Sequence, residues 1–413
     1  MKFSMTQAVL CELVEKAKPF TRKGEYYSQH ATSGVLFEAQ GEEITASAAT
    51  SIGMTTTIPG QFTQAGKVVL DLAGLEYFTH QQFANQEIFF RAVNKTKAEY
   101  GRSVRIAECV AQVGDTNIHV AAVHSSQFGQ MAELVAKEYR PAFTIDAGLL
   151  IGALGQMGPY IDTASYSASG LRIWSEKRNQ LTLGARTGKA MGLRTVECTT
   201  KPEIPEMALD KGEIKALVTA LSRYIKAKPR RPSLGVAEAK AVKVTFDVDV
   251  ATGQRWRVCL GEDTVMFKGD SRYEAPNFRG SVATKGRKVE LPAKAMADAL
   301  RSLPKDAADV VTLTHGINKP TSVEWKHKEK VNRLALDILG MPVLRPMHLD
   351  RKLWGTVLKS FKGDAITLLI PGPDMPLRFT CAQDPELTVC VSQIGREKRA
   401  RAEVNDADSE EDD

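Results

Sequence analysis

Apolar and polar residues follow one pattern that occurs six times along the chain. Each pattern unit begins with a short extended segment, continues with an amphipathic helix of roughly ten to fourteen residues, and ends with two or three strands. The helices are predicted to begin near residues 6, 73, 146, 212, 293 and 351. The amino-acid letters differ between the pattern units, so the repeat lies in the periodicity.

The strands alternate between apolar and polar residues, as in QLTLGAR at 180–186 and RVCLG at 257–261. Alternation indicates a sheet with one buried and one solvated face, and such a sheet needs helices on its apolar side. Two consecutive pattern units would supply a pair of helices. The sequence therefore predicts an α+β fold of three similar domains near residues 1–125, 140–283 and 284–394, with a disordered charged tail at 395–413.

The tail and the rest of the chain differ in charge. Residues 395–413 hold 4 basic and 8 acidic side chains, which leaves 51 basic and 41 acidic residues elsewhere, a net charge of +10. A basic body fits a polyanionic partner, although many enzymes are equally basic. The six cysteines form no CxxC pair, which indicates reduced thiols and a cytoplasmic location. Since no long apolar run occurs, we expect no membrane partner.

Several predicted helices carry lysine and arginine away from the apolar stripe. In the fourth helix Ile214, Leu217 and Leu221 share one face, while Lys215 lies on another arc. Charge on the solvated face of one helix is ordinary, but its repetition on several helices also fits a polyanion. The helices near 73–83 and 146–157 carry neither residue type. The cationic positions of the other helices and of the turn after the first are Arg22, Lys23, Lys211, Lys215, Arg223, Lys226, Lys294, Arg301, Lys352 and Lys359.

Motifs for catalysis are absent from the sequence. We find no P-loop, no dinucleotide-binding glycine fingerprint, no HExxH helix and no GxSxG elbow. Asp247 and Asp249 are spaced to share one side of a strand and to hold a metal, but exposed strand charges explain them more simply. His119 and His124 have no carboxylate or cysteine set nearby, so we interpret them as structural. We therefore expect no catalytic residue, metal or cofactor.

Several passages carry a resemblance to a known family. They are the opening MKF with GVLFEAQGEEITASAAT, then FTIDAGLLIGAL with GLRIWSEKRNQLTLGARTGKAMGL, SRYEAPNFRG at 271–280, and LTVCVSQI at 387–394. Together with the number and order of the pattern units, they resemble the bacterial DNA polymerase III β sliding clamp over residues 1–394. The departures are Lys189 and Ala190 in place of a usual His-Arg pair, and the added tail. They indicate a divergent clamp, such as a phage- or plasmid-encoded one.

The resemblance implies a function and a set of residues. Two chains would close head to tail into a ring through edge strands of their first and third domains. The ring would encircle double-stranded DNA without reading its sequence, and the ten cationic positions would meet phosphates. An ATP-dependent clamp loader would load the ring, which would tether a DNA polymerase. The peptide pocket that takes such partners is implied at Thr187, Gly188, Met191, Val282, Val389 and Val391.

Other interpretations stay open on the sequence alone. Val389 and Val391 equally fit plain core positions of a last strand. A β-rich structural or assembly protein, such as a virion component built from duplicated domains, would show the same pattern. An enzyme with an unrecognised site is a third possibility. The mass in solution separates the first two, because a clamp forms a discrete dimer and a coat protein forms monomers or large polymers.

Overall fold

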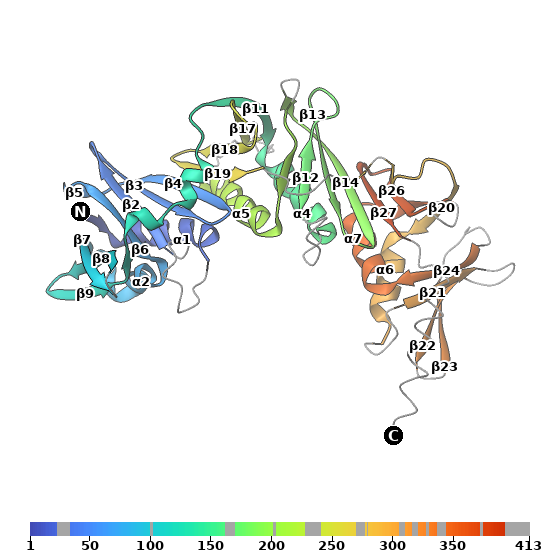
Figure 1. Cartoon of the computed structure of the whole chain (residues 1–413). Coiled ribbons are helices and arrows are strands. Elements are labelled where there is room, and N and C mark those ends of the chain that lie inside the picture. The colour runs from blue at the N-terminus through green and yellow to red at the C-terminus, as the bar shows by residue number, and fades with distance from the viewer. Residues whose placement is uncertain are drawn as a thin grey trace, which may run out of the picture. The chain divides into compact units, whose positions relative to one another are not determined.

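The computed structural model in Figure 1 shows a chain of many strands and few helices. It describes residues 1–22, 34–99, 102–161, 170–200, 204–227, 241–269, 277–278, 280–304, 310–315, 321–327, 330–336, 344–371 and 375–392. The tail predicted at 395–413 and Lys23 lie outside these residues.

The chain forms two compact units. The first comprises Met1–Leu154, Trp174–Gln180 and Glu197–Ser271, and the second comprises Gly155–Ile173, Leu181–Val196 and Arg272–Asp413. Each compact unit contains a sheet whose strands come from pattern units far apart in the sequence. The division into two compact units therefore does not test the three domains that the sequence pattern predicts. The three predicted domain boundaries stay predictions.

The helices begin where the periodicity places them, each within one residue of the predicted start. Those of the six pattern units are α1 (Gln7–Ala17), α2 (Leu72–Glu76), α4 (Ala147–Met157), α5 (Lys211–Ala227), α6 (Ala293–Ser302) and α7 (Arg351–Ser360). A further short helix, α3, spans Gln130–Leu134. α2 is shorter than predicted, because 3-10 turns at Tyr77–Thr79 and Gln81–Phe83 follow it and bring Phe78 and Phe83 into the core.

The residue directly before the helix supplies its cap in five cases, and in four of them that residue is the last of a strand. A threonine or aspartate directly before the helix accepts a hydrogen bond from the backbone N–H three residues later. Such a bond satisfies one of the N–H groups that a helix start leaves without a partner. The capping residues are Thr6, Asp71, Asp146, Asp210 and Asp350. The pattern units therefore share a residue type, threonine or aspartate, at the capping position, which the apolar periodicity did not reveal.

Two antiparallel sheets lie in the first unit. One has the order β5-β1-β7-β8-β9 and consists of β5 (Gln61–Gln64), β1 (Lys2–Thr6), β7 (Glu87–Glu99), β8 (Arg102–Val113) and β9 (Thr116–Val120). The other has the order β10-β6-β2-β3-β4-β19-β18-β17-β11-β15. Its strands are β10 (Ala122–Val123), β6 (Gly66–Asp71), β2 (Gly34–Gln40), β3 (Glu43–Ala49), β4 (Ile52–Ile58), β19 (Asp263–Lys268), β18 (Arg255–Leu260), β17 (Lys243–Asp249), β11 (Tyr139–Asp146) and β15 (Thr199–Thr200).

The second unit repeats this arrangement. One of its sheets contains, in order, β12 (Leu171–Trp174), β13 (Gln180–Arg186), β14 (Ala190–Glu197), β27 (Asp384–Val391), β26 (Leu377–Cys381), β25 (Ala365–Ile370) and β20 (Arg287–Pro292). The other has four strands, β23 (Lys330–Leu336), β22 (Thr321–His327), β21 (Val310–His315) and β24 (Leu344–Asp350), in that order. A short strand of the first unit, β16, spans Met207–Leu209.

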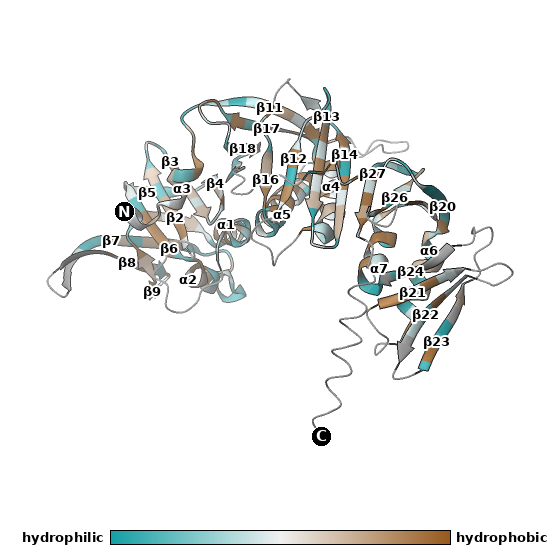
Figure 2. Cartoon of the chain, turned by 45° about the vertical axis from the view of Figure 1, so that its right-hand side comes forward, coloured by the Kyte–Doolittle hydropathy of each residue, from teal (hydrophilic) through white to brown (hydrophobic). Residues whose placement is uncertain are grey.

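Aromatic side chains fill the space between helices and sheets. In the first unit the Phe3 and Phe90 rings stack with centroids 4.9 Å apart. In the second, Trp354 of α7 meets Phe379 of β26 edge to face at 5.0 Å. Figure 2 shows apolar and polar residues alternating along the strands, as the sequence predicts. Trp256 and Trp354 are buried, and all six cysteines are free thiols.

Candidate functional site

α5 presents a cationic face opposite its buried one. Lys211, Lys215 and Lys226 are exposed, whereas Ile214, Leu217 and Leu221 are buried. The predicted faces of this helix are therefore confirmed. Arg223 is half-exposed, with Nη2 3.9 Å from Oε2 of Glu15 on α1. The amphipathic pattern thus directs the lysine charges of α5 to solvent.

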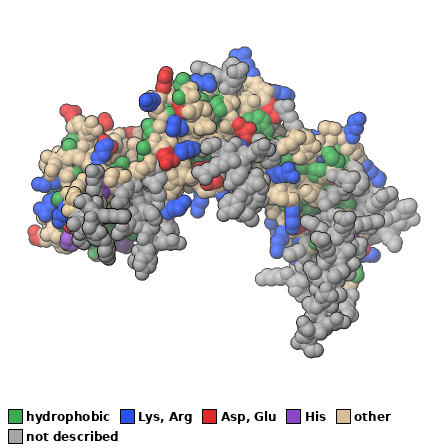
Figure 3. Space-filling view, viewed as in Figure 1, with side chains coloured by type: hydrophobic (Ala, Val, Ile, Leu, Met, Phe, Trp, Pro, Cys, Tyr) green, Lys and Arg blue, Asp and Glu red, His purple; other side chains and the backbone are tan. Residues whose placement is uncertain are grey.

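α6 and α7 repeat this arrangement in the second unit, where they pack against each other. Lys294, Lys352 and Lys359 are exposed, and Arg301 pairs at 3.2 Å with Asp298 one turn earlier. That pair is largely solvated, so solvent screens it and Arg301 can exchange Asp298 for another anion. In the view of Figure 3, lysine and arginine side chains project from the surface of each unit.

Not every lysine near a helix faces solvent in this way. Lys16 on α1 is bound by Glu12 at 2.8 Å and by Asp263 on β19 at 3.0 Å. Burial would lower the pKa of the Lys16 ammonium, but hydrogen bonds to these two carboxylates leave its pKa raised. Lys16 therefore acts as a structural cation. Arg22, which follows the 3-10 turn at Lys18–Phe20, is exposed.

The positions implied for the peptide pocket gather around the junction of β14 and β27. These strands pair antiparallel with Met191 opposite Cys390 and Ala190 opposite Val391. Thr187 and Gly188 lie in the tight turn between β13 and β14, where the Thr187 N–H donates to the Ala190 carbonyl at 2.8 Å. We call residues 186–190 the turn surface.

The six implied pocket positions differ in exposure. Met191, Val389 and Val391 are buried in the sheet, at 4%, 0% and 2% exposure. Gly188 is exposed, while Thr187 and Val282 are half-buried. Directly opposed residues of two paired strands share a face of the sheet, so Val389 and Val391 lie on one face and Met191, opposite Cys390, lies on the other. A bound peptide would therefore meet the turn and Val282 first. All six stay predictions, as do the ten cationic positions.

An ion pair joins the turn surface to the start of α7. Lys189 Nζ lies 2.7 Å from Oδ2 of Asp350, the residue that also caps α7. Burial would raise the pKa of Asp350, but hydrogen bonds from Lys189 and from the Leu353 N–H hold it below its usual range. The carboxylate therefore stays ionised at neutral pH. Sequence reasoning missed this pair because its members lie 161 positions apart.

No known family model and no curated protein matches the sequence. Solved structures do match it. The DNA polymerase sliding clamp of Caulobacter crescentus is 14% identical, with a TM-score of 0.75 over 96% of this chain and 100% of that chain. The DNA polymerase III β subunit of Thermotoga maritima is 15% identical, with a TM-score of 0.71 over 95% of this chain and 99% of that one. The chain has the sliding-clamp fold. The DNA polymerase III β subunit of Pseudomonas aeruginosa, at 12% identity and a TM-score of 0.72 over 95% and 100% of the two chains, has it too.

Identities this low show the fold alone, and the predicted α+β sliding-clamp fold is confirmed. In this version of the fold, a buried polar network supports the junction of β14 and β27. Arg194 on β14 forms an ion pair with Asp384, which is 3% exposed. Gln156 Nε2 lies 3.4 Å from Asp384 Oδ2 and 3.4 Å from the Ser360 carbonyl oxygen. The network therefore ties the ends of α4 and α7 to the sheet.

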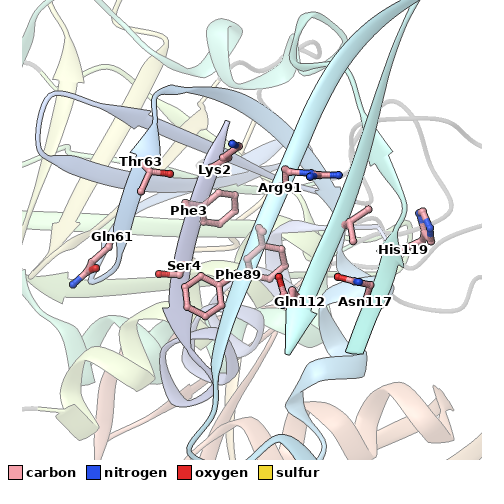
Figure 4. A pocket seen from close by; sticks show the side chains of 12 residues that line it. Lys2, Phe3, Ser4, Gln61, Thr63, Phe89, Arg91, Gln112, Asn117 and His119 are labelled. Atoms are coloured by element: carbon pink, nitrogen blue, oxygen red, sulfur yellow. The ribbon is translucent and has the colours of Figure 1, made fainter. Parts of the chain in front are cut away.

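A surface pocket of about 710 Å³ opens on the five-stranded sheet of this sliding-clamp fold. Figure 4 shows Lys2 of β1, Phe89 and Arg91 of β7, and Asn117 and His119 of β9 around it. The Phe89 side chain is 51% exposed. Ser4, which also lines the pocket, donates a 2.7 Å hydrogen bond to the Glu87 carboxylate. The pocket thus combines phenylalanine rings, of which Phe89 is exposed, with cationic and amide groups. It contains none of the residues that the sequence singled out for DNA or partner binding.

Among the described residues, no three His, Cys, Asp or Glu side chains gather as metal ligands. Asp247 instead pairs with Arg257 at 2.9 Å, and Asp249 accepts hydrogen bonds from Ala251 and Thr252. No helix in the described ranges combines the length and apolar character that a bilayer crossing requires.

Proposed function

We propose that the protein is a DNA sliding clamp, a non-enzymatic processivity factor that encircles duplex DNA and tethers a DNA polymerase. The observation that carries this proposal is the order of strands at the sheet junctions, read together with the fold. In each unit a sheet runs continuously because the third strand of one pattern unit pairs with the third strand of another. These pairs are β4 with β19 and β14 with β27.

In two pattern units the third strand has no such partner within the chain's described sheets, and these two strands suggest how a ring closes. β9 is the last strand of the five-stranded sheet, and β23 is the last strand of the four-stranded sheet. Among the described strands, β9 pairs only with β8 and β23 only with β22. If β9 of one copy pairs with β23 of a second, both partial sheets continue as the internal junctions do. Closure also removes edges that otherwise invite aggregation.

Exposed apolar surface on β23 supports this assignment. Val331 is 63% exposed, which is unusual for a valine on a strand. In the proposed homodimer a second copy would cover the edge that carries it. Val331→Asp should convert the dimer to monomers in sedimentation equilibrium. Val250→Asp, at a 48% exposed valine in a turn, is the matched control and should leave the dimer mass unchanged.

The cationic helix faces support binding to DNA without base readout. Lysines and arginines on α5, α6 and α7 lie away from the cores, where they can meet phosphates through exchangeable contacts. Such contacts are individually weak, so a ring held by topology can slide. The residues proposed for this role are Arg22, Lys23, Lys211, Lys215, Arg223, Lys226, Lys294, Arg301, Lys352 and Lys359.

The decisive experiment separates encirclement from ordinary affinity. The protein is loaded on nicked circular DNA by an ATP-dependent clamp loader, and the circle is then cut once. A sliding clamp leaves the linear DNA from its ends, whereas a protein held by affinity stays bound at equal salt. Retention that does not change on cutting would refute the proposal.

Charge reversal tests the helix faces in the same assay. The triple variant Lys215→Glu, Lys226→Glu and Arg301→Glu should shorten retention on the circle by about tenfold, because like charges then meet the phosphates. Lys177→Glu, at an exposed turn, is the control and should retain normally. An unchanged lifetime of the triple variant would place the DNA elsewhere.

Partner binding is assigned to the turn surface together with Met191, Val282, Val389 and Val391. The support is a short turn, with Gly188 exposed and Thr187 half-buried, next to buried apolar residues of β14 and β27. Such a combination suits a short peptide that anchors apolar side chains and pairs its backbone with the turn. The polymerase and the clamp loader are the proposed sources of that peptide.

A further inference from the structure

The last described strand brings the end of the chain to the turn surface. β27 ends at Val391, opposite Ala190, and the N–H of Ser392 donates to the Lys189 carbonyl oxygen at 2.9 Å. Ser392 is exposed. The chain continues for 21 residues beyond this point, to Asp413. Those residues therefore start at the site assigned above to partner peptides.

The charges of the two segments are complementary. Residues 403–413, EVNDADSEEDD, hold seven acidic and no basic side chains. The turn surface carries Arg186 and Lys189, both exposed, and the Lys189 side chain keeps 73% of its surface accessible while it pairs with Asp350. A second carboxylate can approach this lysine without breaking the existing pair, because an ammonium group has three donors.

The segment between Ser392 and Glu403 is long enough to let the acidic residues reach the turn surface and short enough to keep them close to it. Ten residues, 393–402, lie between Ser392 and Glu403, and the eleven residue-to-residue steps span at most about 35–40 Å when extended. A tether of this length gives its end a local concentration on the order of millimolar near its point of attachment. Binding therefore needs little intrinsic affinity, and a few charge pairs suffice.

We propose that the acidic segment 403–413 binds the turn surface of its own chain and competes there with partner peptides. The inference rests on the proposed function only for the identity of the competitor. The contact itself follows from where β27 ends and from charge. Partners would then need either higher affinity than the tail or a cationic segment that draws the tail away.

The test uses a fluorescent synthetic peptide, RAEVNDADSEEDD, which copies residues 401–413. It is titrated by anisotropy into the full chain and into a full-length variant with an uncharged tail. That variant carries Glu403→Gln, Asp406→Asn, Asp408→Asn, Glu410→Gln, Glu411→Gln, Asp412→Asn and Asp413→Asn. We expect the peptide to bind the variant about tenfold more tightly, because the natural tail no longer occupies the site.

Further substitutions in the uncharged-tail background locate the contact. Arg186→Glu with Lys189→Glu should weaken peptide binding about tenfold or more, while circular dichroism stays native. Lys285→Glu, an exposed lysine in the loop before β20, is the matched control and should leave binding unchanged. If Lys352→Glu with Lys359→Glu abolishes binding instead, the tail belongs to the helix face and the proposal is wrong. Equal binding by the full chain and the uncharged-tail variant would also overturn it.

These outcomes are independent of the clamp assignment. Peptide binding involves no DNA, so the inference can fail while the ring still leaves linear DNA from its ends. Conversely, the tail can occupy the turn surface in a protein that never encircles DNA.

Discussion

The two internal strand junctions are built on the same plan but filled differently. At the junction of β4 and β19, the segment that follows β10 lies across the sheet. Its Phe128, Met131 and Leu134 form one cluster with Ala49 and Met266. At the junction of β14 and β27, a buried polar network around Asp384 lies toward one end of the paired strands and an exposed turn lies at the other. The first junction is covered by apolar side chains of the chain itself, whereas the turn beside the second junction is the surface at which we propose partner binding.

The contrast indicates how one repeated scaffold can present different surfaces at its two strand junctions. An apolar cover adds stability and removes the surface from use, because its side chains already occupy the groove. A buried ion pair fixes the geometry of the neighbouring strands while leaving the outer turn free. Its net contribution to stability is small, since desolvation offsets the attraction between the charges.

Breaking the ion pair of the second junction should have the largest effect. Arg194→Ala leaves the Asp384 carboxylate buried without its cation, and we expect the second unit to lose about 3–5 kcal/mol. The urea midpoint followed by Trp354 fluorescence measures this. The control is Lys268→Ala, which removes a solvated pair with Glu133 at the first junction and should cost under about 1 kcal/mol. Equal costs would erase the distinction between the junctions.

Removing the apolar cover of the first junction comes next. Leu134 is 2% exposed, so Leu134→Ala should cost about 3 kcal/mol through lost burial and a residual cavity. Leu149→Ala on α4, where the side chain is 55% exposed, should cost under about 0.5 kcal/mol. Both are measured by urea unfolding. A small effect at Leu134 would mean that the connecting segment is not a seal.

Two glycines allow a matched test across the junctions. A Cβ at Gly192 would lie 2.6 Å from Cδ2 of Tyr160, a buried ring that is hydrogen-bonded to Ser360 at 2.8 Å. A Cβ at Gly53 would lie 2.7 Å from Sδ of Met131 and 2.8 Å from Cδ1 of Leu134. Because aliphatic side chains adjust more readily than a fixed ring, Gly192→Ala should cost about 2 kcal/mol and Gly53→Ala about 1 kcal/mol. The reverse order in thermal unfolding would contradict this account.

The smallest expected effect depends on pH. Burial, with the Asp210 carboxylate nearby, raises the pKa of Glu213 to about 7, although a hydrogen bond from Ser51 of the β3–β4 turn opposes the rise. The folded state then binds more protons than the unfolded state between pH 4.5 and 7, so stability falls as pH rises through that window. Glu213→Gln keeps the capping oxygen for the Asp210 N–H and removes the ionisation.

We therefore expect Glu213→Gln to gain about 1–2 kcal/mol relative to the natural chain between pH 5 and pH 8. Urea midpoints at the two pH values measure the difference. Glu262→Gln, at an exposed turn between β18 and β19, should show no such pH dependence. A variant that parallels the natural chain at both pH values would show that Glu213 ionises freely in the fold.

The sequence by itself determined the local architecture. Periodicity placed all six helix starts within one residue and separated buried Leu217 from exposed Lys215, because burial of one face imposes a period that each segment carries in its own letters. The length of α2 was wrong, since packing of Phe78 and Phe83 overrode the helical pattern there.

Only the tertiary structure decided which segments meet. The pairing of β14 with β27, the Arg194–Asp384 network and the Lys189–Asp350 contact join residues more than 150 positions apart. A contact at that separation leaves no mark on local periodicity, because either partner alone looks like an ordinary strand or surface residue. Val391 shows the limit, because the sequence pattern fits a core strand and a pocket lining equally well. The fold buries Val391 and pairs it with Ala190, next to the turn.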